Sequence, residues 1–255
     1  MSISFEEYEA FDPRVKIKYE GSDVVFATPN RHTAWRAQTL FTKEPDTIEW
    51  IASFDPGDIL FDVGANVGMY TIWAAKTRSA RVYAFEPESQ NYALLNKNIF
   101  INQLDKLVEA YCVAISDETR LDRLFLSRFI LGGSCHNFGE SVDFKHEKFS
   151  ASFTQGSIST SIDRLTIGDR LLPIPNHIKI DVDGIEDKVI LGALKTLEQK
   201  DVRSVLIEIN TNLESHWEIV DLMLDLGFDY SRSQVEQAQR KEGTFKGVGN
   251  YVFRR

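Results

Sequence analysis

Apolar runs alternate with amphipathic helical patterns along most of this 255-residue chain. Five buried strands are expected at 59–63, 81–85, 109–115, 178–182 and 204–209, and two shorter strands near 228–231 and 249–253. Helices are expected between them at about 67–77, 89–101, 186–198 and 214–226. Apolar strands that are separated by helices form parallel sheets covered on both faces. The pattern therefore predicts a doubly wound α/β fold with a mostly parallel sheet and helices on both faces.

Two segments depart from this alternation. The N-terminal stretch 1–44 contains a hairpin pattern at 15–27 and is expected to form a small cover on a catalytic core at 45–255. The stretch 117–176 is irregular and longer than a normal connection, so it is expected to be a substrate-side insertion. No repeat and no linker rich in proline, glycine or serine divides the chain. We therefore expect a single domain.

The composition fits one globular domain and narrows the choice of partners. Hydrophobic residues make up 43% of the chain, charged residues make up 26%, and the formal net charge is -9. This charge disfavours a nucleic-acid substrate, because proteins hold phosphate backbones with a basic face. Cys112 and Cys135 lack the paired spacing of a zinc site or a disulfide framework and are expected to be free thiols. No membrane span and no signal-peptide pattern is found, so a cytoplasmic protein is expected.

The first buried strand runs directly into a glycine-rich turn, FDVGANVG. Ligands of parallel sheets bind where the strands end, and glycines there let a cofactor approach the backbone closely. The candidate contacts in this turn are Asp62, Gly64, Asn66 and Gly68. The second strand ends in Glu86 and Pro87, and an acid at this position can accept both hydroxyls of a ribose. Asn91 and Tyr92, in the helix that follows, could touch the cofactor, but we expect them on the helix surface.

Charge distinguishes the cofactors that this turn can hold. The carboxylate of Asp62 would repel a pyrophosphate at the helix N-terminus but attract the ammonium and sulfonium groups of S-adenosylmethionine. Asn66 stands where the dinucleotide-binding motif has its second glycine, and no Lys-Ser/Thr pair completes a phosphate-binding loop. S-adenosylmethionine is therefore the expected cofactor. The alternatives are an NAD-binding oxidoreductase and a catalytically silent module that binds an adenosine cofactor on the same fold.

Taken together, several stretches of the chain resemble the FkbM-type methyltransferases. They are FDVGANVGMYT at 61–71, YAFEPESQNYALLNKN at 83–98, VAISD at 113–117, TSIDRL at 160–165, HIKIDVDGIEDKVILGA at 177–193 and VLIEIN at 205–210. The resemblance implies a class I methyltransferase fold, Rossmann-like with seven strands, and O-methylation by S-adenosylmethionine. It leaves the acceptor open, since members of the family modify sugars, polyketides and other hydroxylated molecules. We expect a small-molecule or glycan acceptor.

The resemblance also implies which residues hold the cofactor. The residues that look like the cradle of the methionine moiety are Asp62, Gly64, Ala65, Asn66 and Gly68. Glu86 looks like the acid that binds the ribose. Ala114, Ile115 and Ser116 resemble the edge of the adenine site, although Ser116 has a simple turn role as its alternative.

The strand in IKIDVDGIED ends in several acids where methyl transfer is expected. Asp181 is the leading catalytic candidate, and it could orient the cofactor, accept the proton of the acceptor or bind a divalent cation. Asp183 is a further catalytic candidate that could instead cap the next helix. Glu208 and Asn210 would complete an oxygen ligand set for Mg²⁺ with Asp181, unless Glu208 pairs with a basic residue and Asn210 caps a loop. His136, in the insertion, is a candidate general base.

Overall fold

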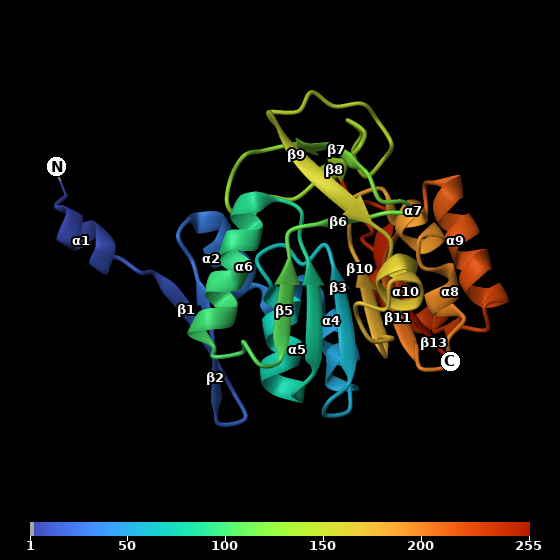
Figure 1. Cartoon of the computed structure of the whole chain (residues 1–255), viewed down its shortest axis with the longest axis horizontal. Coiled ribbons are helices and arrows are strands. Elements are labelled where there is room, and N and C mark those ends of the chain that lie inside the picture. The colour runs from blue at the N-terminus through green and yellow to red at the C-terminus, as the bar shows by residue number, and fades with distance from the viewer. Residues whose placement is uncertain (1–2) are drawn as a thin grey trace.

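The computed structural model describes residues 3–255 and is built around a seven-stranded sheet (Figure 1). The strands, in their order across the sheet, are β12 (Asp229–Tyr230), β13 (Val248–Arg254), β11 (Ser204–Asn210), β10 (His177–Ile180), β3 (Ile59–Val63), β4 (Arg81–Phe85) and β5 (Val108–Tyr111). Neighbouring strands from β11 to β5 are parallel, whereas β13 runs antiparallel to both of its neighbours. The α/β fold expected from the sequence is confirmed, and the sheet is mixed.

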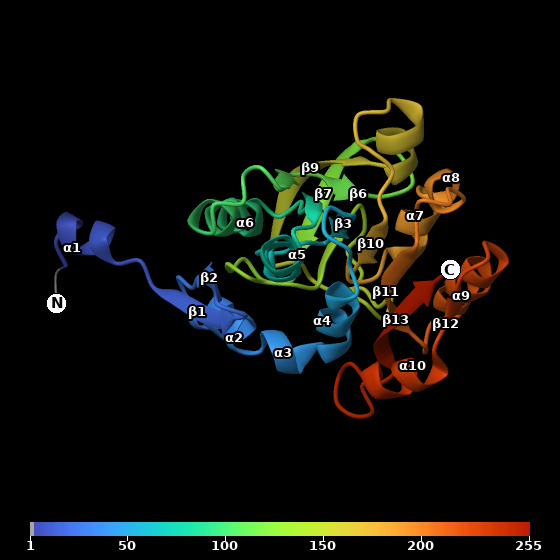
Figure 2. The ribbon, with the colours of Figure 1, turned by 90° about the horizontal axis from the view of Figure 1, so that it is seen from below.

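Helices cover both faces of this sheet (Figure 2). One face carries α4 (Pro45–Ala52), α5 (Met69–Arg78) and α6 (Ser89–Ile101), and the other carries α7 (Glu186–Leu191), α8 (Leu194–Leu197) and α9 (Glu214–Asp225). Successive residues of a strand point to opposite faces, so Leu60 packs in the first core and Phe61 in the second. A further helix, α10 (Arg232–Ala238), packs beside β13. No helix in residues 3–255 is long and apolar enough to cross a membrane.

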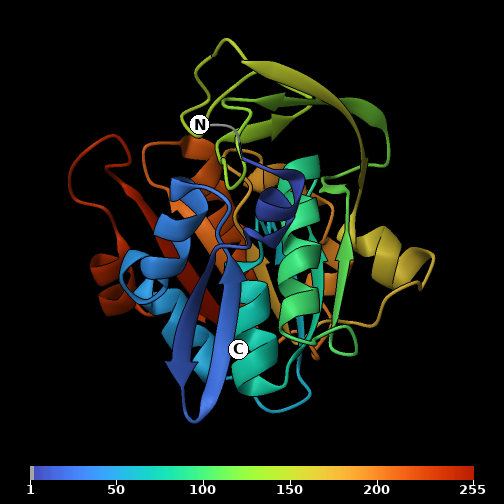
Figure 3. The ribbon, with the colours of Figure 1, turned by 90° about the vertical axis from the view of Figure 1, so that its left-hand side faces the viewer.

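The N-terminal stretch contributes two separate features. Its elements are α1 (Phe5–Ala10), β1 (Arg14–Tyr19), β2 (Ser22–Ala27), α2 (Arg31–Gln38) and α3 (Leu40–Lys43). The hairpin β1–β2 lies beside α6 (Figure 3). There, Asn98 Oδ1 accepts a hydrogen bond of 2.8 Å from the backbone N–H of Ala27. It does not cover the strand ends. That position is taken by α2 and α3, whose side chains line the cavities described below.

The insertion is more regular than its sequence suggests. It contributes three strands to a four-stranded sheet, which consists of β6 (Ala114–Ile115), β9 (Phe153–Thr160), β7 (Leu121–Leu126) and β8 (His136–Phe138), and it contains a short π-helix, η1 (Arg164–Gly168). The expectation of an irregular stretch is therefore wrong. It failed because β9, FTQGSIST, is mostly polar and leaves much of its surface exposed, so it lacks an apolar pattern. This small sheet lies over the carboxyl ends of β3, β4 and β5 (Figure 1).

Candidate active site

Three cavities meet where β3, β4 and β10 end, and Gly64, Asn66 and Asp181 line all of them. The inner cavity, between the end of β4 and the four-stranded sheet, is lined by residues that include Glu86, Pro87, Ala114, Ile115, His136 and Phe138. The α3-side cavity is lined by residues that include Asp62, Ala65, Tyr70 and Lys179. The outer cavity, with a volume of about 380 Å³, is lined by residues that include His32, Trp35, Arg36, Asp183, Glu208 and Arg240.

The turn after β3 needs glycine for packing. Gly64 has a φ of +79°, and a Cβ at this position would lie 1.9 Å from the carbonyl oxygen of Asp181. Space for a cofactor is therefore only part of the reason for this glycine, because the turn also packs against the backbone that follows β10. Gly68 has a φ of +83°, and a Cβ there would lie 2.4 Å from Leu95 Cδ1. Gly68 lines none of the three cavities, so the structure does not bring it to the site as expected.

Glu86 links the end of β4 to this turn. Its buried carboxylate accepts hydrogen bonds from the backbone N–H of Asn66 at 2.8 Å and from that of Glu88 at 2.9 Å. Burial raises the pKa of Glu86 to about 7, although both hydrogen bonds act in the opposite direction. Each carboxylate oxygen has two lone pairs, so Glu86 can still accept hydrogen bonds from the inner cavity.

The expected adenine edge is assembled only in part. Ala114 and Ile115 line the inner cavity, but Ser116 does not. The hydroxyl of Ser116 donates a hydrogen bond of 2.9 Å to Asp117 Oδ1, and its carbonyl oxygen would lie 2.2 Å from a Cβ at Gly192. The structure thus supports the turn role of Ser116. Gly192 lies between α7 and α8, into which the single helix expected at 186–198 is divided.

Asp62 has one oxygen without a partner in the described chain. Thr71 Oγ1 donates a hydrogen bond of 2.5 Å to Asp62 Oδ2, whereas Asp62 Oδ1 is buried and accepts none. Burial raises the pKa of Asp62, and the nearby charge of Lys179 opposes this shift. Because a buried acceptor without a hydrogen bond is unfavourable, this oxygen suits a ligand that donates one.

The segment 131–135 of the insertion is held over these cavities by side chains from three other elements. The carbonyl oxygen of Gly133 accepts hydrogen bonds from Asn66 Nδ2 at 2.6 Å and from Asn91 Nδ2 at 3.1 Å. Arg36 Nε donates a hydrogen bond of 2.7 Å to the neighbouring carbonyl oxygen of Gly132. Asn91 is fully buried and lines the inner cavity, so its expected place on the helix surface is wrong. The sequence carried no signal for this contact, because its partner lies far away in the chain.

A buried lysine controls the charge of Asp181. Lys179 Nζ lies 2.8 Å from Asp181 Oδ2, and the lysine side chain is almost completely buried. Burial opposes the charges of both groups, but their attraction outweighs it, so the pKa of Lys179 is raised and that of Asp181 is lowered. Lys179 was not among the expected site residues. Its signal was a lysine inside the otherwise apolar strand HIKI.

Asp183 and Glu208 are closer to neutral than Asp181. Burial, followed by the charge of Asp181, raises the pKa of Asp183 to about 6. The same two causes raise the pKa of Glu208, although Arg240 lies 3.1 Å from its carboxylate. Asp183 has a φ of +59°, and it accepts a hydrogen bond of 2.7 Å from the backbone N–H of Cys135. It does not cap α7, whose N-cap is the residue Ile185.

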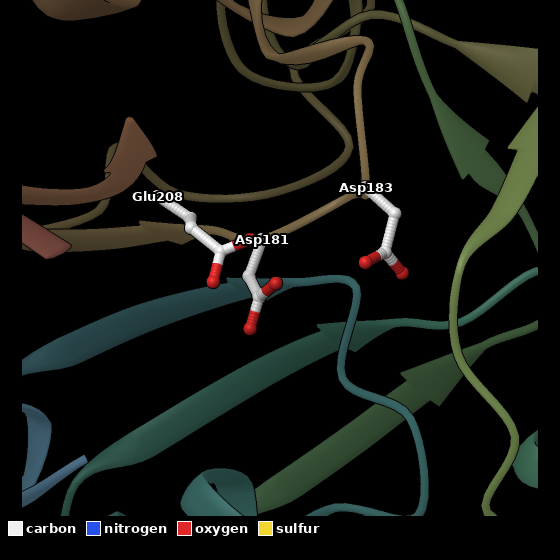
Figure 4. A group of neighbouring side chains, drawn as sticks. All are labelled: Asp181, Asp183 and Glu208. Carbon is white, nitrogen blue, oxygen red and sulfur yellow. The ribbon is translucent and has the colours of Figure 1, made fainter. Parts of the chain in front are cut away.

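The structure replaces one member of the expected metal-ligand set. Oxygens of Asp181, Asp183 and Glu208 lie within 4.8 Å of one another, and the three side chains point to the same side (Figure 4). Asn210 is not part of this group: its Nδ2 donates to the carbonyl oxygen of Phe144, and its Oδ1 accepts hydrogen bonds from Asn212. Each of the three acids already has a donor from the protein as its partner. The structure therefore keeps Asp181 and Glu208 of the expected ligand set together, adds Asp183 and leaves Asn210 out, and we derive no step through a metal ion.

His136 lies in the inner cavity, on β8. Burial, together with the charge of Arg36, lowers the pKa of His136 to about 4. Neither of its ring nitrogens has a hydrogen-bond partner in the described chain. A neutral imidazole of such low basicity next to Phe138 suits contact with a bound ring better than removal of a proton.

This sheet order and the cavities at its carboxyl edge define a class I methyltransferase fold. The chain belongs to the FkbM methyltransferase family, as expected, because the family model described as "Methyltransferase FkbM domain" matches residues 62–230. Methyltransferase FkbM from Methylobacillus flagellatus KT has a similar crystal structure, with a TM-score of 0.50 and 14% identity. The similarity covers 89% of this chain and 55% of that one, so this chain spans about half of its length.

Two relatives of known name are similar in sequence. The 31-O-demethyl-FK506 methyltransferase FkbM of Streptomyces tacrolimicus is 29% identical over 195 residues, which cover 68% of this chain and 73% of the relative. The hexuronic acid methyltransferase AglP of Haloferax volcanii is 27% identical over 198 residues, which cover 74% of this chain and 71% of the relative. Both relatives are methyltransferases, in agreement with the family.

Proposed function

We propose that this chain is an S-adenosylmethionine-dependent O-methyltransferase that acts on a hydroxyl group of a small molecule or glycan. The observation that carries the proposal is that three cavities meet at Gly64, Asn66 and Asp181. In this arrangement the inner and α3-side cavities hold the cofactor and the outer cavity holds the acceptor. The two molecules meet at the three shared residues. The names of the two relatives support the acceptor class, since one is named for 31-O-demethyl-FK506 and the other for hexuronic acid.

The inner and α3-side cavities suit the two ends of S-adenosylmethionine. When bound, the cofactor supplies a methyl group that its positively charged sulfur makes electrophilic. Glu86 accepts hydrogen bonds from the ribose hydroxyls, and Ile115 and Phe138 provide apolar walls for the adenine. The free Oδ1 of Asp62 accepts a hydrogen bond from the ammonium group. An NAD-binding oxidoreductase fits less well, because Asp62 would repel a pyrophosphate at the same turn.

Asp183 is the best general base among the three catalytic candidates. Asp181 is held in its ionised form by Lys179 and is therefore weakly basic, and His136 has its pKa lowered to about 4. A carboxyl with a pKa near 6 is mostly ionised at neutral pH and remains basic enough to take a proton. Bound S-adenosylmethionine would supply the methyl group to the acceptor oxygen and leave as S-adenosylhomocysteine, and Asp183 would take the proton of the acceptor hydroxyl.

Calorimetry with S-adenosylmethionine and with NAD tests the cofactor assignment. We expect S-adenosylmethionine to bind and NAD not to bind. Glu86→Gln should weaken binding by about 10-fold or more, because it removes a charged acceptor worth about 1.5–3 kcal/mol and turns an NH₂ group toward backbone donors. Glu109→Gln, at an exposed acid of β5, is the matched control and should bind normally. Tighter binding of NAD, or normal affinity in a folded Glu86→Gln variant, would contradict the assignment.

A further inference from the structure

The mouth of the outer cavity gathers positive charge in a chain that is acidic overall. His32 and Arg36, from α2, line this cavity together with Lys43 from the end of α3. Burial lowers the pKa of His32, and the charges of Arg36, Arg128 and Lys43 lower it further. These three cations therefore lie close enough to His32 to act on it. The formal net charge of the whole chain is -9, so this concentration of cations is local.

Of the cations that line the outer cavity, Arg36 has no acidic partner in residues 3–255. Lys43 pairs with Glu44 at 2.5 Å, and Arg240 pairs with Glu208 at 3.1 Å. Arg36 uses its Nε for the carbonyl oxygen of Gly132, which leaves its other N–H groups available. Neither Arg36 nor Arg128 has an ion pair with an acid of the described chain.

The cofactor does not neutralise this charge. S-adenosylmethionine has one carboxylate but two cationic groups, so its binding adds positive charge to the site. Its carboxylate can be held by Lys43 on the α3-side cavity, which Lys43 also lines. Arg36 lines the α3-side cavity as well as the outer cavity, and we assign it to the acceptor because Lys43 suffices for the single carboxylate of the cofactor. A planar guanidinium with several donors prefers a carboxylate or phosphate.

An exposed aromatic surface lies beside these cations. Trp35 lines the outer cavity, and 45% of it is exposed. Its ring stacks on that of His32, with 5.8 Å between the ring centroids and 23° between the planes. A large flat apolar face at the entrance of a cavity of about 380 Å³ suits the face of a cyclic ligand with one or two rings.

We propose that the acceptor is an anionic cyclic polyol, a sugar ring that carries a carboxylate or a phosphate. Its anionic group binds to Arg36 at the mouth, its ring lies on Trp35, and one hydroxyl reaches Asp183 on the cavity floor. Asp181, Asp183 and Glu208 line the same cavity, so the anionic group must bind at Arg36 and point away from these acids. This inference rests on the proposed function and specifies its acceptor.

The test measures equilibrium binding, so that it does not require the natural acceptor. Glucose, glucuronate and glucose 6-phosphate are titrated by calorimetry into the protein saturated with S-adenosylhomocysteine. We expect at least one anion to bind about 10-fold more tightly than glucose, and the preferred anion identifies a carboxylate or a phosphate site. Arg36→Met should abolish this preference. Arg31→Met, at an exposed position of the same helix, is the matched control and should keep it.

Three results would overturn the inference. The first is equal or absent binding of both anions relative to glucose. The second is an anion preference that survives Arg36→Met, and the third is an Arg36→Met variant that loses affinity for S-adenosylhomocysteine alone. The last result would assign Arg36 to the cofactor. In each case S-adenosylmethionine still binds to the wild-type protein, whereas failure of the proposed function would appear as loss of that binding.

Discussion

The contact between Gly64 and the backbone after β10 makes Gly64→Ala the most informative substitution in the fold. Its Cβ would lie 1.9 Å from the carbonyl oxygen of Asp181, and backbone atoms cannot move aside as the end of a side chain can. Two other glycines allow the cost of the left-handed backbone conformation to be separated from the cost of the contacts that the added Cβ makes. Gly57 has a φ of +88° and would have nothing within 4 Å of its added Cβ, and Gly68 has a φ of +83° with only Leu95 Cδ1 closer than 3 Å.

The three variants should therefore form a series. Gly57→Ala carries only the unfavourable left-handed conformation, which lowers the free energy of unfolding by about 1–2 kcal/mol. Gly68→Ala adds a contact that Leu95 can relieve by changing its rotamer. Gly64→Ala adds a backbone clash, and overpacking of this kind lowers the free energy of unfolding further, by about 1–3 kcal/mol. We expect a total of about 2–5 kcal/mol for Gly64→Ala.

Urea titration of the three variants measures these losses directly. The variant at Gly64 should also lose affinity for S-adenosylmethionine, because any shift of the turn moves Asp62 and Asn66 relative to Asp181. A loss of stability at Gly64 no larger than that at Gly57 would refute the close contact between the two turns. Normal cofactor affinity in a destabilised Gly64→Ala variant would instead show that the turn does not hold the cofactor.

Two further predictions concern the charged residues of the site. The value of kcat/KM should rise with pH around a midpoint of about 6, because Asp183 must be ionised to accept a proton. Asp183→Asn should lower the value of kcat/KM at high pH by about 10²-fold or more. A flat pH profile in the wild-type protein would argue against Asp183 as the base. Lys179→Met should lower the free energy of unfolding by about 3–5 kcal/mol, because it leaves Asp181 without a partner. Urea titration measures this loss, and the double variant with Asp181→Asn should recover part of it.

The strand ends could be predicted because their signals are local. A buried parallel strand is an apolar run, and the residues that follow it meet at one edge of the sheet whatever the loops do. Asp62, Glu86 and Asp181 were brought to one site by this rule alone, and helix α6 has the bounds expected from its pattern. The alternation of apolar and polar residues also predicted the hairpin β1–β2, but it did not predict which side of the core the hairpin covers.

The remaining features depend on contacts between distant parts of the chain. Asn91 contacts the carbonyl oxygen of Gly133, 42 residues away, and no periodicity in the helix reports that contact. The place of Asn210 in the expected ligand set was wrong for a similar reason. Asn210 has a side chain suited to metal binding, but the insertion supplies the carbonyl oxygen of Phe144 as its partner, and a motif cannot show which of two partners an amide will take.

Lys179 decides which of the three neighbouring acids carries charge. Three half-buried carboxylates within 4.8 Å of one another cannot all ionise at neutral pH without strong repulsion, so their pKa values must separate. The 2.8 Å contact between Lys179 and Asp181 stabilises the ionised form of that acid in particular. The charge of Asp181 then contributes to the raised pKa of Asp183, which brings it into the range that proton removal at neutral pH requires. By keeping Asp181 ionised, a lysine buried in the sheet thus adds to the effect of burial on the basicity of Asp183, which it does not contact.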